Sequence, residues 1–206
     1  MVIATKHVMA SQYNAEIVAG ALLPNESRIL AQLKLDRIPD EELRRQITTE
    51  NILQKRSPAT AIRMARLIHN RFQYADDELL RIVVSESRAI SNQALLVIAI
   101  RHSRLLGDFL LRVVKEHWRQ FQTKLKATDW DEFLNQCEQL DPSVKNWQVS
   151  TRIKLDRVVR KCLVEAGYLE SSRNPTIIPV YLAPEIRAYL LRPGNEYVLS
   201  AMEITL

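Results

Sequence analysis

Glycine is scarce in this sequence, with 4 residues among 206. This scarcity argues against glycine-rich loops that surround a phosphate with backbone amides, and against an architecture of strands and tight turns. No Walker A, GxGxxG, GxSxG or kinase-type segment occurs. The sequence therefore carries no recognisable catalytic signature, and we expect a protein without enzymatic activity or a cofactor.

Cysteine is equally rare, because Cys137 and Cys162 are the only two. They do not form a CxxC pair, and two cysteines alone cannot complete a zinc site. The histidines are His7, His69, His102 and His117. None of them falls in an HExxH spacing or another known ligand spacing. We therefore predict free thiols in a reducing compartment, no metal site and no catalytic residue.

Long apolar runs are absent as well. The longest uninterrupted run covers seven residues, 94–100, and Arg101, His102 and Arg104 follow it at once. A helix that spans a bilayer needs about 20 apolar residues. The N-terminal residues 1–12 also lack the apolar core of a signal peptide. These features predict a buried core helix and a cytoplasmic protein with no membrane partner.

What the sequence does contain is an ordinary globular composition with a basic excess. Hydrophobic residues make up 47% and charged residues 26%, and the formal net charge is +5. A chain of this length fits one large domain or two small lobes packed together. The positive charge favours an anionic partner, although the net value is weaker evidence than the clustering of the charges.

Residues 51–72 show the clearest clustering. Ser57 is a good N-cap and Pro58 suits the first helical position, so a helix is expected over about 58–73. Its apolar face would comprise Ala61, Ala65, Ile68 and Phe72. Its opposite face would carry Arg63, Arg66 and Asn70, and Lys55 and Arg56 precede the helix. No acid occurs between Glu50 and Asp76, so this basic face lacks acidic neighbours in the sequence.

A second basic helix is predicted over about 150–166, with Ser150 as its cap and Gly167 just after its end. Its apolar face would comprise Leu155, Val158, Val159, Cys162 and Ala166. Its opposite face would carry Lys154, Arg157 and Lys161, the same i, i+3, i+7 spacing as in the first basic helix. Arg160 lies beside this face and is included among the candidate contacts.

The rest of the chain predicts further helices. Their approximate ranges are 26–35, 40–48, 76–87, 88–101, 109–125, 128–140, 143–147 and 185–191. Residues 168–182, with a polar turn at 171–175 and Pro179 in the second strand, predict a small β-hairpin. The segment from residue 197 to the end fits either helix or strand.

These elements predict a mainly α fold, a compact helical bundle packed as one unit. Residues 1–127 would form an N-terminal lobe with a helix-turn-helix-like element, because a helix and a short connection precede the first basic helix. Residues 128–206 would form a C-terminal winged-helix-like lobe, because three helices and a hairpin follow one another there.

A single basic helix face is more often a solvated surface than a binding site. Two helices with the same basic spacing, each last in a helix-turn-helix-like order, shift the interpretation towards nucleic acid. The three tryptophans lie on apolar helix faces, so core packing is favoured for them over base stacking. The candidate DNA contacts are Lys55, Arg56, Arg63, Arg66, Asn70, Lys154, Arg157, Arg160 and Lys161.

Five stretches, in order along nearly the whole chain, resemble the BrxA family of bacterial BREX phage-defence systems. They are residues 51–61 (NILQKRSPATA), 102–109 (HSRLLGDF), 130–133 (WDEF), 150–155 (STRIKL) and 165–169 (EAGYL). The resemblance implies a compact, mostly helical cytoplasmic protein that binds double-stranded DNA beside the methyltransferase and ATPase components of the system. It transfers no catalytic motif and no individual DNA contact.

The expected function is therefore non-catalytic binding of double-stranded DNA within an antiphage system. The alternative is an adaptor whose basic faces dock an acidic protein partner or RNA, with incidental DNA binding. Phosphate contacts alone supply affinity without sequence choice, and nothing in the sequence argues for base-specific reading.

Overall fold

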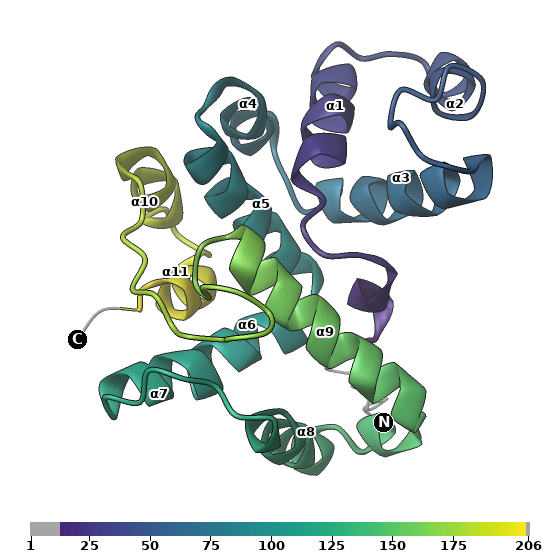
Figure 1. Ribbon diagram of the computed structural model, residues 1–206. Coiled ribbons are helices and arrows are strands. Elements are labelled where there is room, and N and C mark those ends of the chain that lie inside the picture. The colour runs from purple at the N-terminus through teal and green to yellow at the C-terminus, as the bar shows by residue number, and fades with distance from the viewer. Residues whose placement is uncertain (1–12, 205–206) are drawn as a thin grey trace, which may run out of the picture.

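The computed structural model describes residues 13–204, and these residues form a mainly helical protein (Figure 1). The first half contains η1 (Glu16–Ala19), α1 (Pro24–Leu35), α2 (Asp40–Thr48), α3 (Pro58–Phe72), α4 (Asp77–Ser85) and α5 (Arg88–His102). The second half contains α6 (Arg104–Phe109), η2 (Leu110–Val114), α7 (Lys115–Arg119), α8 (Thr128–Leu140), η3 (Pro142–Asn146), α9 (Val149–Glu165), α10 (Pro184–Leu190) and α11 (Glu196–Met202).

Helix α5 is the central element. Its apolar run 94–100 is buried throughout, as the sequence predicts, and the helix contacts α1, α3, α4, α6, α10 and α11. A helix that is apolar on all sides belongs in the interior of a protein or in a bilayer. Within residues 13–204, no helix is both long enough and apolar enough to cross a membrane.

Helices α6 and α7 continue one another through η2, which is a π-helical stretch. The predicted helix 109–125 therefore starts earlier, at Arg104, and ends earlier, at Arg119. Phe121 follows in the left-handed region with φ of 58°, which ends the helix. Single π-helical turns inside α-helices are rare and are frequent at functional sites.

The start of α3 agrees with the sequence prediction. Ser57 has extended dihedral angles and its Oγ accepts a hydrogen bond from the Thr60 N–H at 3.3 Å, while Pro58 begins the helix. Gly167, at φ of 85°, follows the end of α9 as predicted. The cap of α9 was predicted wrongly, because the helix begins at Val149, one residue before Ser150.

Replacing Ser57 with alanine is expected to lower the free energy of unfolding by about 1 kcal/mol, because the first turn of α3 loses its side-chain acceptor. Urea denaturation followed by circular dichroism measures this change. Ser57→Thr, which keeps a hydroxyl, serves as the control and should change stability by less than half as much. An unchanged midpoint for Ser57→Ala would show that the cap does not contribute.

The predicted β-hairpin over 168–182 does not form as a pair of strands. Within residues 13–204 only isolated antiparallel bridges occur, between Leu169 and Ile177 and between Lys124 and Thr176. Pro175 and Pro179 lie on either side of the bridged residues and have no N–H to extend a ladder. The segment is thus held by a few hydrogen bonds, such as that from the Ile178 N–H to the Tyr168 carbonyl at 3.0 Å.

The C-terminal segment, for which the sequence left helix and strand open, forms α11 as far as Met202, and residues 205–206 lie outside the described residues. Gly107 of α6 lies close to this helix. A Cβ at position 107 would stand 2.5 Å from Tyr197 Oη and 2.8 Å from Ile100 Cγ2. The absence of a side chain at Gly107 therefore lets α6 approach α5 and α11.

The short helix η1 packs against both α3 and α9, so it connects the two predicted basic helices. In Figure 1 it lies between them on the right of the molecule. Arg71, near the end of α3, is buried and donates hydrogen bonds to the carbonyls of Gly20 and Ala21. The Leu22 N–H donates to Glu165 Oε2 of α9 at 2.7 Å. This segment fixes how α3 and α9 lie relative to each other.

Candidate nucleic-acid interface

Helix α3 presents the basic face that its sequence predicts. Ala61, Ile68 and Phe72 are buried, whereas Arg63, Arg66 and Asn70 are exposed on the other side, with Arg56 exposed just before the helix. Thirteen ion pairs occur among residues 13–204, and neither Arg63 nor Arg66 takes part in one. Two guanidinium groups thus stand in solvent without a neutralising carboxylate.

Lys55 differs from its neighbours on this face. Its ammonium group forms an ion pair with Glu26 of α1, and its backbone N–H donates to Asn51 Oδ1 at 2.8 Å. The Lys55 side chain is only 20% exposed. This lysine therefore attaches the loop before α3 to α1, and the free cations of the first basic surface are Arg56, Arg63 and Arg66.

Helix α9 carries the second basic surface. Lys154 and Arg157 are exposed and take part in no ion pair formed within residues 13–204. Lys161 is 61% exposed and its Nζ lies 3.8 Å from Glu165 Oε1, at the outer limit for an ion pair. The predicted spacing thus places three cations along one exposed side of the helix.

Arg160 does not lie on this exposed side. It is only 7% exposed, its Nε donates to Asp156 Oδ1 at 2.6 Å, and it donates a second hydrogen bond to the Lys126 carbonyl at 3.0 Å. An acid four residues earlier in a helix is a common partner for an arginine. Arg160 therefore holds the segment before α8 against α9.

A cleft of about 610 Å³ runs beside α9. Arg157 and Lys161 line it from the helix, and Arg173 lines it from the loop that follows residue 170. Its one acid, Asp156, is already bonded to Arg160. Arg173 was missed by the sequence reasoning, because it lies in a loop with no periodicity and reaches the cleft only through the fold.

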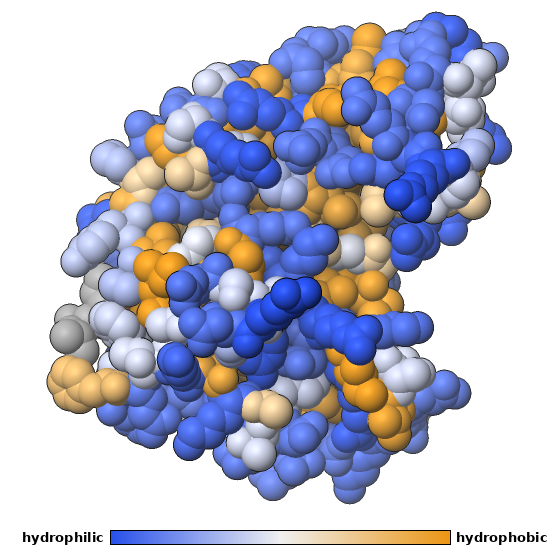
Figure 2. All heavy atoms as spheres, viewed as in Figure 1, coloured by the Kyte–Doolittle hydropathy of each residue, from blue (hydrophilic) through white to orange (hydrophobic). Residues whose placement is uncertain are grey.

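In the view of Figure 2, strongly hydrophilic residues lie over the middle of α9 and hydrophobic residues over its lower right end. The outline of the molecule is indented on the right between the part formed by α1–α3 and the part below it. Helix η1 contacts the helices on both sides of this region. The two basic helices are therefore linked through η1, although they lie about 90 positions apart in the sequence.

Both cysteines are buried inside the protein, and Cys162 lies on the buried side of α9. Burial raises the pKa of the Cys137 thiol to about 11 and that of the Cys162 thiol to about 12. Among residues 13–204 no group of three or more His, Cys, Asp or Glu side chains is arranged to hold a metal ion.

Both thiols should therefore react slowly in the folded protein. At about pH 8, three units below the pKa of Cys137, only about one thiol in a thousand is ionised, and the thiolate is the reactive form. We expect labelling by an aromatic disulfide reagent to be at least about 100-fold slower than in the urea-unfolded chain. Two rapidly labelled thiols in the native protein would contradict the buried positions.

The fold and this surface define a class: a small, mainly helical protein whose unpaired basic side chains gather on two helices joined by a short N-terminal segment. The chain belongs to the BrxA family, since the model of that family, described as BrxA, matches residues 11–194.

Named relatives and a solved structure agree with this assignment. The chain is 38% identical to "BREX protein BrxA" of Paramagnetospirillum magneticum over 95% of this chain and 98% of that protein. It is 35% identical to "BREX protein BrxA" of Escherichia coli O9:H4, over 91% and 88% of the two chains. A crystal structure of an uncharacterized protein from Magnetospirillum magneticum superposes with a TM-score of 0.85 at 36% identity, covering 94% of this chain and 100% of that one.

Proposed function

We propose that this protein is a non-catalytic, cytoplasmic component of a BREX antiphage system and that it binds double-stranded DNA through α3 and α9. Two relatives that align over nearly their whole length are named BREX protein BrxA. The observation that carries DNA binding is the set of exposed cations without a close ion-pair partner on the two helices. They are Arg56, Arg63, Arg66, Lys154 and Arg157, with Lys161 at the margin.

In this proposal the cations neutralise backbone phosphates, and no side chain reads base edges. Phosphate contacts position a protein on a duplex and supply affinity that is independent of sequence. Helices α2 and α3 would act as a helix-turn-helix-like pair, in which α3 faces the duplex. Helix α9 and Arg173 beside it would supply a second, separate strip of contacts.

Helix α9 also offers an internal control. Both Lys161 and Arg160 line the cleft, but Lys161 is 61% exposed whereas Arg160 is only 7% exposed and is bonded to Asp156. Replacing Lys161 with glutamine should weaken DNA binding and leave stability unchanged. Replacing Arg160 with glutamine should lower stability, because Asp156 loses its partner. The folded fraction of this variant should bind DNA as tightly as the wild type.

The second candidate function is an adaptor that docks a protein partner. Exposed apolar side chains at the junction of α8 and α9 favour it, since Leu140, Val149 and Ile153 are 51%, 72% and 49% exposed. Apolar residues that remain exposed close together are typical of protein interfaces. Here the basic helices would contact an acidic protein or RNA.

A mobility-shift titration separates the two functions. Labelled duplex DNA is titrated with the protein, and unlabelled duplex, RNA of the same length and heparin are added as competitors. We expect duplex DNA to bind and to compete effectively against its labelled form. Absence of a shift at micromolar protein, or competition by RNA far stronger than by duplex, would overturn the DNA-binding proposal in favour of the adaptor.

A further inference from the structure

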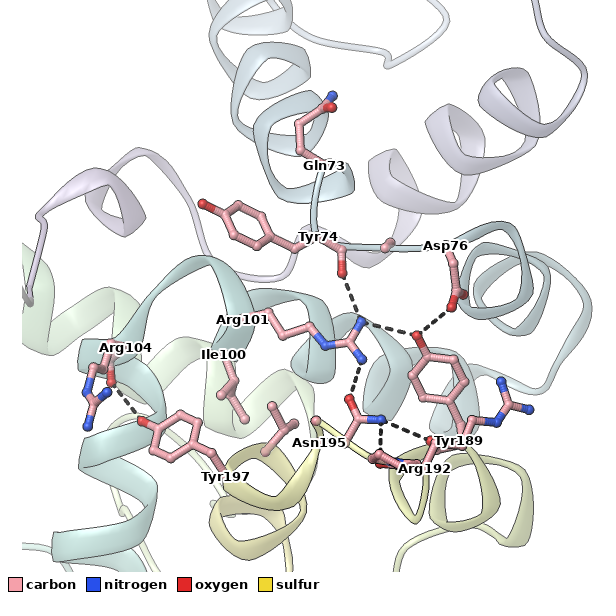
Figure 3. Close-up of a pocket in the computed structure, with 14 residues that line it drawn as sticks. Gln73, Tyr74, Asp76, Ile100, Arg101, Arg104, Tyr189, Arg192, Asn195 and Tyr197 are labelled. Carbon is pink, nitrogen blue, oxygen red and sulfur yellow. Dashed lines mark hydrogen bonds between the residues drawn. The ribbon is translucent and has the colours of Figure 1, made fainter. Parts of the chain in front are cut away.

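A second cleft, of about 880 Å³, lies outside the two basic helix faces. It is formed by the connection between α3 and α4, the end of α5, the start of α6, and the C-terminal helices α10 and α11 with the loop between them. Figure 3 shows Arg101 at its centre and Arg104 with Tyr197 to one side. Nothing in the proposed DNA contact uses these residues.

Arg101 is held in place by neutral groups and takes part in no ion pair within the part of the chain that the structure describes. Its guanidinium donates hydrogen bonds to the Tyr74 carbonyl at 2.9 Å, to Tyr189 Oη at 3.1 Å and to Asn195 Oδ1. All three acceptors are neutral. The guanidinium also lies 5.3 Å from the centre of the Tyr189 ring, a cation–π distance. These contacts fix the position of the Arg101 guanidinium, and its positive charge can still attract an anion.

Arg104 repeats the arrangement three residues later. Its guanidinium lies 5.3 Å from the centre of the Tyr197 ring, and its side chain is 51% exposed. Asp108 is 3.5 Å from its Nε, but that buried carboxylate already accepts hydrogen bonds from two tyrosine hydroxyls. The cleft thus holds two arginines, each stacked on a tyrosine, and Arg104 shares its carboxylate partner Asp108 with Arg112.

The cleft has two other charged lining residues, Arg192 and Asp76. Arg192 forms two hydrogen bonds of 2.7 Å with Glu78. Asp76 accepts hydrogen bonds from the Leu79 N–H and from the Tyr189 hydroxyl, and this hydroxyl in turn accepts one from Arg101. Asp76 therefore partly balances the charge of Arg101 without forming an ion pair with it. The charged residues of the cleft and their ion-pair partners comprise four arginines and three carboxylates, so an excess of one positive charge remains beside the cleft.

Beside these arginines stands an aromatic surface. Tyr74 is 48% exposed, and its ring packs edge-on against His102 with 5.7 Å between the ring centres, which holds it at the mouth of the cleft. Arginine is the residue best suited to bind phosphate oxygens in pairs of hydrogen bonds. A tyrosine face beside it can stack a nucleobase.

We propose that this cleft binds a nucleotide, with its phosphate on Arg101 and Arg104 and its base against Tyr74. The volume lies within the range of about 300–1,000 Å³ that is usual for small-ligand sites. The nucleotide is either free or the end of a nucleic-acid strand, since both present a phosphate next to a base. This site is independent of the duplex contact on α3 and α9.

Isothermal titration calorimetry with ADP, adenosine and pyrophosphate tests the proposal. ADP should bind more tightly than either part alone. Arg104→Gln and Tyr74→Ala should each weaken ADP binding by about tenfold or more, the usual loss for a charged hydrogen bond or a stacked base. Arg119→Gln, which removes a charge from a side chain of similar exposure (54%) outside the cleft, should leave ADP binding unchanged.

Further titrations identify the source of the nucleotide and keep the test separate from duplex binding. A 5′-phosphorylated trinucleotide that binds more tightly than ADP would mark a strand end as the ligand, and the reverse order would mark a free nucleotide. Arg63→Glu with Arg66→Glu, which targets the duplex, should retain ADP binding. The proposal is overturned if no phosphorylated probe binds, if both cleft variants bind ADP like wild type, or if hexaglutamate binds as tightly as ADP.

Discussion

Reversing the two unpaired charges of α3, with Arg63→Glu and Arg66→Glu together, is expected to lower duplex DNA affinity by about 50-fold or more at roughly 0.1 M salt. Each phosphate contact contributes about 0.9 to the magnitude of the slope of log affinity against log salt. One contact therefore makes the binding constant about eightfold larger at 0.1 M salt than at 1 M salt. Losing two contacts therefore lowers the binding constant by about 60-fold, and repulsion between the new glutamates and the phosphates lowers it further. Fluorescence anisotropy with a labelled duplex measures the change.

The matched control is Arg81→Glu with Arg119→Glu, which makes the same change in net charge at exposed positions outside both basic helices. It should weaken binding only by the smaller, long-range effect of net charge. Stability should be unaffected by the α3 reversal, because neither Arg63 nor Arg66 forms an ion pair with another residue between positions 13 and 204. Equal losses in the two double variants would mean that α3 does not face the duplex.

The largest expected effect on stability comes from Asp108. This carboxylate is 1% exposed and accepts hydrogen bonds of 2.6 Å from Tyr13 Oη and from Tyr197 Oη, with Arg112 3.6 Å away. Burial raises the pKa of both tyrosines, and the hydrogen bonds that they donate to Asp108 raise it further. The carboxylate thus joins the N-terminal segment, the α6–α7 helix and α11.

Asp108→Ala should lower the free energy of unfolding by about 3–5 kcal/mol, because it removes the acceptor of two tyrosine hydroxyls and the anion paired with Arg104 and Arg112. Asp108→Asn, which keeps the shape and one acceptor oxygen, should cost less. Urea denaturation is the measurement, and Glu132→Ala on the exposed side of α8 is the control, expected within about 0.5 kcal/mol of wild type. A small loss for Asp108→Ala would show that the three elements are held together by other contacts.

The helices were predicted correctly where the apolar periodicity and the capping residues indicated the same boundaries. Helix α3 begins at the predicted residue, and α5 is buried along the predicted run. The hairpin failed because Pro175 and Pro179 limit pairing to isolated bridges, a constraint that outweighs the β-branched residues between them. The boundary of α9 shifted by one residue, which is normal for helix ends.

The stretches that resemble the BrxA family serve the fold more directly than they serve a ligand. Asp108 lies in one of them, and Glu165 and Gly167 lie in another, where Glu165 accepts from Leu22 and Gly167 ends α9. Trp130 and Phe133 form a third, and both pack against Phe109. Resemblance can therefore identify the family while leaving the binding residues to be argued from exposure and charge.

The candidate site was predicted in part. A helical wheel identifies cations that share a helix face, so Arg63, Arg66 and Arg157 could be predicted from the sequence. It does not show tertiary partners, so it could not separate Lys55, bound to Glu26, or Arg160, bound to Asp156, from the free cations. The arginine–tyrosine cleft was not predicted at all, because Arg101 meets Tyr189 from 88 residues away.

The most direct test of the account is the salt dependence of duplex affinity. About six neutralised phosphates predict a slope near −5 for log affinity against log salt. The α3 reversal should reduce the magnitude of the slope to about 3, and Lys154→Gln with Arg157→Gln in α9 should reduce it by a similar amount. A flat salt dependence in the wild type, or an unchanged slope in both variants, would contradict the claim that these helices bind DNA phosphates.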